Sequence, residues 1–502
     1  MAAPIAMLID SLPNEEDKIS VLSDLKAALG NLSSATISSI VVNVSYNTVF
    51  DCLSTNNREQ LELGCDVLTK LLQPLSPDVI LTQFQDDLKT GLIHPEPAVR
   101  KLCAVQLERV SKELPSVLLQ YEDIILQVVK TMADDKLDVA QSAGNVIVNI
   151  EGNTDGLLSM FGGSVLTAIQ DILTMNDTVR FRVYEVIIRI SSESSRGLQR
   201  CSECGLLQQF LNEGHRDDIL VQLNCLELLS DLALTEHGLI YLDQQGTISS
   251  LENMMKQSQS DPLAGFLVPG LVKFFGCVAK VHPKEVLSTN ETFVSTVFNN
   301  LSTPENDSML NLAVQTVGFI GSSVEGKLAL EKLGSTMING VRCIGKSLRE
   351  SQQESKIVIL QALANLLRLK VPDQTSELLK LTELWYSHLG TRTFDYFMSL
   401  ADQPFPDLRL ALLSVFETLS SQLWGQVLMN NQPGFREYLL DRSTEKTKEG
   451  KEMKFSVVSS LANSPTSTDV FGPPYMVQLK VYCAQGPFFV RAQAEVAMEG
   501  DS

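Results

Sequence analysis

The chain has 502 residues, of which 60 are acidic and 40 basic, so its formal net charge is −20. This acidity argues against a nucleic-acid partner or an anionic membrane surface, because both are bound by clustered Lys and Arg. Hydrophobic residues make up 44% of the chain, which excludes intrinsic disorder. The nine Cys are too few for a disulfide scaffold and indicate reduced thiols in an intracellular protein.

Residues 1–55 are predicted to form an N-terminal helical cap. No basic residue precedes Lys18, so the start of the chain lacks the pattern of a signal or transit peptide. The most apolar stretch, Leu263–Val281, is interrupted by Pro269 and Lys273 and is too short to span a bilayer. We therefore expect a soluble protein.

Residues 56–430 repeat one pattern. An apolar marker residue is followed by further small or apolar residues four and eleven positions later, and these three positions share one face of an α-helix. The markers, which recur every 38 to 50 residues, are Leu61, Val99, Val139, Val179, Val221, Leu267, Leu310, Val358 and Leu408. Repeats of this length with two or three helices are typical of armadillo and HEAT proteins. The sequence therefore predicts an all-α, armadillo/HEAT-like superhelical solenoid of about nine repeats with capping helices.

Glycines recur with the same period. Glycine at such places ends one helix and lets the next turn away. Three pairs are spaced eight residues apart: Gly197 with Gly205, Gly238 with Gly246, and Gly326 with Gly334.

Residues 431–491 are predicted to form a C-terminal cap. Within it, 441–454 is a charge-dense insertion that we expect to be mobile. The sequence Phe471–Pro474 (Phe-Gly-Pro-Pro) breaks the chain before a last short element, and 492–502 is expected to be a flexible tail.

One segment, Gly340–Ser347, matches the phosphate-loop pattern G-x-x-x-x-G-K-[ST], and Gly321–Lys327 matches it except that Leu328 replaces the Ser or Thr. A working phosphate loop follows a buried strand. Here Val341 and Ile344 belong to a helical apolar stripe instead. We interpret the match as accidental and predict no catalytic residues, no enzymatic activity and no cofactor.

Cys201 and Cys204 have the spacing of half a zinc or redox site, with His215 and Cys225 downstream. A structural zinc site would need a second close ligand pair, and the sequence contains none. Cys225 also belongs to the apolar column four residues after the markers. We therefore predict no metal site.

Candidate partner-binding residues are expected on the concave face, which the last helix of each solenoid repeat lines. Arg, Tyr and Phe are frequent anchors at protein interfaces. The alternative for Phe274 is a core position, because it stands seven residues after its marker. The candidates are Arg100, Arg180, Arg182, Glu185, Lys273 and Phe274.

Several segments together resemble one family, that of the 26S proteasome non-ATPase regulatory subunit 5, a group of HEAT/armadillo-repeat chaperones of the proteasome base. These segments follow one another over nearly the whole chain: Gly91–Arg100, Asn176–Glu185, Pro269–Gly276, Val324–Lys327, Gln403–Pro406 and Pro433–Tyr438.

The resemblance implies a non-enzymatic assembly chaperone for the base of the 19S regulatory particle. Such a chaperone binds the C-terminal domain of one base ATPase, in an intermediate that also holds a second ATPase and the largest non-ATPase subunit. It dissociates before the mature proteasome forms, when assembly offers the ATPase better contacts. The resemblance also implies a cytoplasmic location, with the nucleus as a second compartment, and a monomer when free. We add the hypothesis that acidic residues of the concave face steer a basic ATPase surface.

The alternative function is a generic armadillo-type cytosolic adaptor or scaffold for an extended peptide or protein partner. Readers of extended peptides in this class use regularly spaced Trp and Asn along the groove. This chain has two Trp, Trp385 and Trp424, both towards one end. The sequence therefore favours the chaperone.

Overall fold

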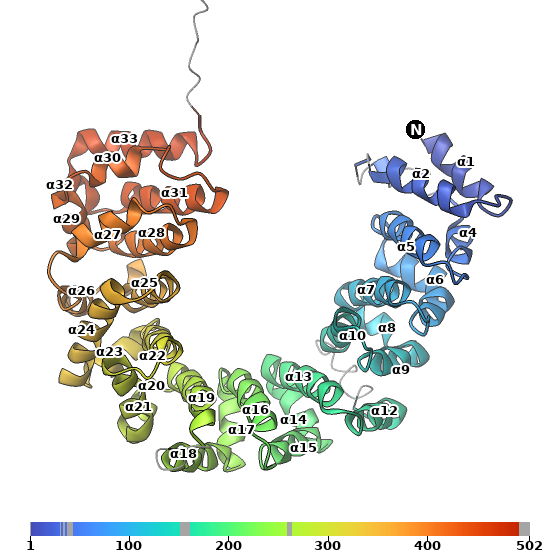
Figure 1. The fold of residues 1–502 in the computed structure, drawn as a ribbon, viewed down its shortest axis with the longest axis horizontal. Helices are drawn as coiled ribbons and strands as arrows, with labels where there is room; N and C mark the ends of the chain where they lie inside the picture. The colour runs from blue at the N-terminus through green and yellow to red at the C-terminus, as the bar shows by residue number, and fades with distance from the viewer. Residues whose placement is uncertain are drawn as a thin grey trace, which may run out of the picture. The chain divides into compact units, whose positions relative to one another are not determined.

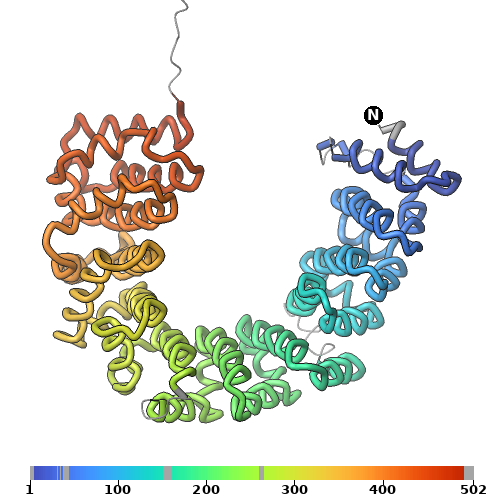
Figure 2. The backbone as a smooth tube through the Cα atoms, viewed as in Figure 1, coloured from blue at the N-terminus to red at the C-terminus, as the bar shows by residue number. Residues whose placement is uncertain are grey.

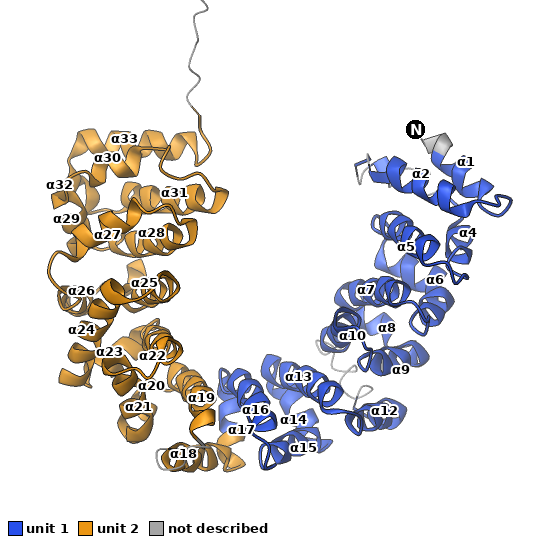
Figure 3. Ribbon diagram, viewed as in Figure 1, with its two compact units in different colours: residues 1–241 blue, residues 242–502 orange. Residues whose placement is uncertain are grey.

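The computed structural model describes residues 2–30, 32–33, 36–37, 44–150, 161–258 and 264–490. Within these ranges the regular elements are α-helices and short 3-10 helices, and there is no strand, as the sequence predicts. The chain divides into two compact units, residues 1–241 and 242–502 (Figure 3). Among the described residues, no helix combines the length and the apolar character needed to cross a bilayer. The predicted tail, 492–502, lies outside the described residues.

Unit 1 is built from stacked helices in which a shorter helix or pair of helices precedes each long one (Figure 1). At its N-terminal end, the predicted cap packs on the first long helix through its second helix. The elements are α1 (Ala2–Ser11), α2 (Lys18–Gly30), α4 (Tyr46–Asp51), α5 (Arg58–Leu72), α6 (Pro77–Gly91), α7 (Pro97–Glu113), α8 (Pro115–Leu118), α9 (Glu122–Thr131), α10 (Leu137–Ile150), α12 (Gly163–Leu173), α13 (Asp177–Glu193), α14 (Ser195–Glu203), α15 (Leu206–Glu213) and α16 (Ile219–Leu232). Helix α17 (Glu236–Gln244) contains the boundary between the units.

Unit 2 repeats a three-helix arrangement, which can be followed along the backbone tube in Figure 2. Its elements are α18 (Thr247–Gln257), η2 (Ala264–Leu267), α19 (Val268–Val281), α20 (Pro283–Thr289), α21 (Glu291–Ser302), α22 (Asp307–Ile320), α23 (Val324–Glu331), α24 (Ser335–Glu350), α25 (Gln353–Leu367), η3 (Val371–Asp373), α26 (Ser376–Ser387), α27 (Thr393–Ala401), α28 (Pro406–Ser420), α29 (Leu423–Asn431), α30 (Phe435–Leu440), α31 (Lys448–Asn463), α32 (Ser467–Phe471) and α33 (Pro473–Gln485).

The long helices lie in one row along one side of each unit (Figure 1), and neighbours in the row pack on one another. We call this the long-helix row. It consists of α5, α7, α10, α13 and α16 in unit 1, and of α19, α22, α25, α28 and α31 in unit 2.

The buried stripe predicted for these helices is confirmed with one exception. Val358 is only half-buried, because α25 turns Ser355 and Ile359 inward instead. The other eight markers are buried. The positions four and eleven residues after the markers are buried in every repeat: Cys65, Cys103, Ala143, Val183, Cys225, Leu271, Val314, Ala362 and Leu412, and Leu72, Val110, Ile150, Ile190, Leu232, Val278, Gly321, Leu369 and Leu419.

The two glycines of a pair have different roles, so the prediction that both serve as turns is half right. Gly246 has φ +70° and lets the chain turn between α17 and α18, as the second glycine of a pair is expected to do. Gly238 lies inside α17 instead, where a Cβ would stand 2.2 Å from the carbonyl oxygen of Leu232. The first glycine therefore lets the new repeat pack directly on the end of the preceding long helix.

A buried amide joins several elements of unit 2. The Gln422 side chain is fully buried, and its Nε2 donates to the carbonyl oxygen of Leu367 at 2.8 Å. Its Oε1 accepts from Thr382 Oγ1 at 2.8 Å and from Trp424 Nε1 at 3.0 Å. Because both ends of the amide are satisfied, the group links α25, α26 and α29 without leaving a buried polar atom unpaired.

The segment 441–454, which we expect from its charge to be mobile, makes buried contacts with the rest of unit 2. Glu445 is buried, and so is Lys454, whose Nζ donates to the carbonyl oxygen of Asp441 at 2.6 Å. Burial lowers the pKa of Lys454 to about 8. The charged side chains of this segment hold it against the C-terminal repeat. The density of charged residues in the sequence does not show that some of them are buried.

Candidate partner-binding grooves

Side chains of α13 and α16 form a groove in unit 1 of about 510 Å³, which we call the acidic groove. Residues of α16 at positions i, i+3, i+4 and i+7 face it, as expected for one side of a helix. One lining residue, Arg182, is basic. Four are acidic: Asp177, Glu185, Glu227 and Asp231. The remaining lining residues are Thr178, Phe181, Asn224 and Leu228.

Arg182 and Glu185, both predicted as candidates, lie together on α13. They line the acidic groove and also a smaller one of about 260 Å³ between α10 and α13. Arg182 Nη1 donates to the carbonyl oxygen of Asp134 at 2.7 Å, so its guanidinium is held at the groove by the preceding repeat. The Glu185 side chain is exposed. This pair is placed where a partner can reach it.

Arg180 is placed differently from Arg182, although only one residue separates them. Its side chain is largely buried, Nε stands 3.3 Å from Glu213 Oε1, and the guanidinium also pairs with Asp177. The prediction of partner contact by Arg180 is therefore corrected, because its guanidinium forms ion pairs within α13 and between α13 and α15.

Arg100 is likewise used inside the molecule. Its Nε lies 2.5 Å from Asp134 Oδ2, and its Nη1 donates to the carbonyl oxygen of His94 at 2.8 Å. Burial raises the pKa of Asp134 more than any other single cause, but hydrogen bonds from Arg100 and from the Lys136 backbone outweigh it, so this pKa is lowered overall. Arg100 joins successive repeats instead of facing a partner.

Lys273 and Phe274, neighbours on α19, differ in exposure. Lys273 is exposed and lines a groove of about 370 Å³ with the amide side chains of Gln315 and Gln361. Phe274 is 0% exposed, and its ring centroid is 5.2 Å from that of Phe275. The prediction of partner contact by Phe274 is wrong, because seven residues after the marker is a core position.

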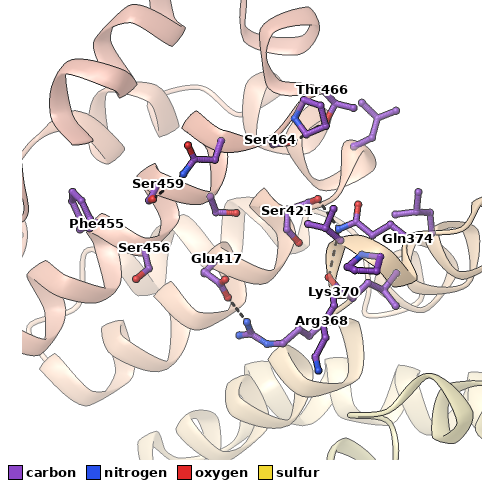
Figure 4. A pocket seen from close by; sticks show the side chains of 18 residues that line it. Arg368, Lys370, Gln374, Glu417, Ser421, Phe455, Ser456, Ser459, Ser464 and Thr466 are labelled. Atoms are coloured by element: carbon purple, nitrogen blue, oxygen red, sulfur yellow. Dashed lines mark hydrogen bonds and ion pairs between the residues drawn. The ribbon is translucent and has the colours of Figure 1, made fainter. Parts of the chain in front are cut away.

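A further groove was not predicted. It has a volume of about 910 Å³ and lies in unit 2 between the end of α25, η3, α28 and α31 (Figure 4). We call it the hydroxyl groove, because α31 supplies three serines. Its lining residues are Arg368, Leu369, Lys370, Val371, Pro372, Gln374, Leu379, Glu417, Ser421, Leu423, Phe455, Ser456, Ser459, Ser460, Asn463, Ser464, Pro465 and Thr466.

Two contacts hold the walls of the hydroxyl groove in place. Arg368 Nη1 lies 2.5 Å from Glu417 Oε2, and Gln374 Nε2 donates to the carbonyl oxygen of Ser421 at 2.9 Å (Figure 4). Both contacts tie the segment after α25 to α28. The sequence signal for this groove is the polar face of α31, where Ser456, Ser459, Ser460 and Asn463 recur at helical spacing.

The phosphate-loop match lies inside α24, as predicted, and not between a strand and a helix. A Cβ on Gly345 would stand 2.0 Å from the carbonyl oxygen of Leu389, so this glycine serves helix packing. Lys346 is exposed, and its Nζ is 3.8 Å from Glu350 Oε2, one turn further along the helix.

The partial phosphate-loop match, Gly321–Lys327, ends in a lysine whose side chain is buried. Its Nζ donates to the carbonyl oxygens of Gly321 and Asn365, the latter at 3.2 Å, near the C-terminal ends of α22 and α25. Burial lowers the pKa of Lys327 to about 7. The lysine thus satisfies carbonyl groups that helix ends leave without partners.

The cysteine cluster is a component of the packing. Cys201 and Cys225 are buried, and Cys204 Sγ donates to the carbonyl oxygen of Phe161 at 3.2 Å. Among the described residues, no group of three His, Cys, Asp or Glu side chains is placed to hold a metal ion.

Stacked repeats with a row of long helices, and grooves between neighbours in that row, define a HEAT/armadillo-type α-solenoid. The chain is similar in fold to yeast importin-β, with a TM-score of 0.51 and 11% identity over 91% of this chain and 65% of that one. A second importin-β structure gives a TM-score of 0.56 and 15% identity over 94% and 61%. At these identities the likeness concerns the fold alone.

The chain belongs to the family described as the proteasome non-ATPase 26S subunit, whose sequence model matches residues 1–502. It is 35% identical to the human 26S proteasome non-ATPase regulatory subunit 5 over the full length of both chains. It is 23% identical to the Drosophila melanogaster protein of the same name, over 98% of this chain and 97% of that one. The resemblance found in the sequence is confirmed.

Proposed function

We propose that this chain is a non-enzymatic assembly chaperone for the base of the 19S regulatory particle of the 26S proteasome. The observation that carries the proposal is the 35% identity to a proteasome regulatory subunit over the entire length of both proteins. The proposed client is the C-terminal domain of a base ATPase. It is bound in an intermediate with a second ATPase and the largest non-ATPase subunit, and released before the mature proteasome forms.

The long-helix row supports a binding role of this kind. Grooves open between neighbouring long helices in both units, so that a folded domain can be contacted at several repeats. We assign the contact to exposed or half-buried groove residues, Arg182 and Glu185 in unit 1 and Lys273 in unit 2. A client held in this way is kept from docking elsewhere, and it leaves when a later assembly step offers it more favourable contacts.

The acidic groove suggests how the client is attracted. Four carboxylates face it beside one guanidinium, in a protein of net charge −20. Complementary charge raises the association rate and selects partners more than it strengthens the final complex. We therefore propose that a basic ATPase surface is steered towards unit 1. We place the activity in the cytoplasm, with the nucleus as a second compartment, and we propose that the free protein is a monomer.

The test is a tagged pull-down from cell extract, resolved on a native gel and identified by mass spectrometry. The proposal requires base ATPases and the largest non-ATPase subunit to co-purify without core-particle subunits. Recovery of whole proteasomes would instead make the chain a stable subunit. If no ATPase is recovered, the chaperone proposal fails and the alternative, a solenoid adaptor for another partner, takes its place.

A matched pair of variants locates the contact. Glu185→Arg changes the charge of the acidic groove, and Glu291→Arg makes the same change at an exposed position at the start of α21. Recovery of ATPases should fall with the first variant and stay constant with the second. Equal recovery would remove the acidic groove from the proposal.

A further inference from the structure

The hydroxyl groove is positively charged, in contrast to the chain as a whole. Its charged lining residues are Arg368, Lys370 and Glu417, in a protein of net charge −20. Arg368 pairs with Glu417. Within the described ranges, Lys370 is exposed and has no ion pair or hydrogen-bond partner for its ammonium group. One cation of the groove therefore remains available to a carboxylate.

The same groove exposes apolar surface beside its polar side chains. Of its apolar lining residues, Val371 is 71% exposed and Leu423 is 47% exposed. The serines of α31 supply hydrogen-bonding groups along the other wall. This composition fits a segment that carries both apolar side chains and carboxylates, and whose main chain can bond to hydroxyl groups.

The segment 491–502 of this same chain has that composition. It contains Glu495, Val496, Met498, Glu499 and Asp501, so two apolar side chains are flanked by three carboxylates. We infer that the hydroxyl groove is the docking site of residues 491–502, with Val496 and Met498 on the apolar wall and a carboxylate on Lys370.

The distance to be covered is compatible with this docking. Arg442 lies over the rings of Phe489, at 5.4 Å, and Tyr482, at 3.6 Å, and Tyr482 is 6.5 Å from the Phe455 ring at one end of the groove. These distances place Phe489 no more than about 16 Å from Phe455. The nine residues from Phe489 to Met498 span up to ~30 Å when extended, which is more than the distance to the Phe455 end of the groove.

The first test is zero-length cross-linking of the full chain with a carbodiimide, which joins an amine to a carboxylate that touches it. The expected product joins Lys370 to Glu495, Glu499 or Asp501, and it should weaken as salt screens the contact. Lys370→Arg keeps the charge and removes the product. Lys380, exposed on α26 and outside the groove, is the matched control and should give no product with these carboxylates.

The second test compares hydrogen exchange in the full chain and in a chain that ends at Val490. Amides of 370–374 should exchange several-fold faster in the shorter chain, and a synthetic peptide of residues 491–502 should restore their protection. A full-length Glu495→Lys/Glu499→Lys variant should behave like the shorter chain. Equal exchange in all forms, together with no cross-link to Lys370, overturns the inference and leaves the groove to a segment of another protein. No proteasome component enters either test, so failure here does not bear on the proposed chaperone function.

Discussion

Arg409 and Glu445 form an ion pair between α28 and the segment before α31, with Nε 3.2 Å from Oε2 and side chains that are 10% and 2% exposed. Removing one partner of such a pair leaves the other charge buried and uncompensated. We expect Glu445→Ala to lower the free energy of unfolding of unit 2 by ~3–5 kcal/mol, measured by urea unfolding.

Two further variants distinguish a lost ion pair from lost packing. Lys448→Ala breaks an exposed pair with Glu452 and should change stability by less than ~0.5 kcal/mol. The double variant Arg409→Met/Glu445→Leu should be more stable than Glu445→Ala, because it does not leave the Arg409 charge buried without its partner. The explanation fails if the double variant is the less stable of the two.

Lys327 predicts a pH dependence of stability. Its pKa falls to about 7 in the folded protein from 10.5 when exposed. Between these values the unfolded chain binds more protons, so the free energy of unfolding rises with pH, by up to ~1.4 kcal/mol per pH unit. Lys327→Met should flatten this rise between pH 7.5 and 9.5, whereas Lys332→Met, at an exposed position, should preserve it. Parallel profiles for all three proteins would contradict the prediction.

The two glycines of the α17–α18 pair should respond differently to alanine. A Cβ at Gly238 meets the carbonyl oxygen of Leu232, and we expect a loss of ~1–3 kcal/mol or more from overpacking. Gly246 has open space but a φ of +70°, so Gly246→Ala should cost only ~1 kcal/mol. Thermal unfolding followed by circular dichroism orders the two variants. The reverse order would mean that backbone conformation matters more than the close approach.

The phosphate-loop match makes a prediction about nucleotides. Lys346→Ala removes an exposed side chain and should change the free energy of unfolding by less than ~0.5 kcal/mol. The effect of ATP on the melting temperature should be the same in the variant and in the unaltered protein. Gly345→Ala should destabilise α24 by ~1–3 kcal/mol, because of the contact with the carbonyl oxygen of Leu389. A nucleotide-dependent shift in melting temperature that disappears in Lys346→Ala would revive the phosphate loop.

Steering by the acidic groove predicts that binding depends on salt. Affinity for a purified base ATPase should fall between low and physiological ionic strength, mainly through slower association. Glu185→Gln should make this salt dependence shallower, and Glu291→Gln should not. Identical association rates at both ionic strengths would exclude steering, whatever the affinity.

The repeats were predictable because a buried stripe of period 3.6 is a local property of each helix. Val358 differs from the other markers because its helix buries Ser355, three residues earlier, in place of the marker. The use of Arg100 could not be predicted, because its partner Asp134 lies 34 residues away in the next repeat. The hydroxyl groove was missed for the same reason, since the segment around Val371 and the serines of α31 come from different repeats.

The Gln422 amide has a mechanical consequence. A stack in which each repeat touches only its neighbours gives way from a free end in small, equal steps. Here one side chain is bonded to Leu367, Thr382 and Trp424, so the end of α25, α26 and α29 cannot separate in succession. Pulled from its C-terminal end, unit 2 is expected to yield gradually up to this amide, and then to lose several helices in a single rupture.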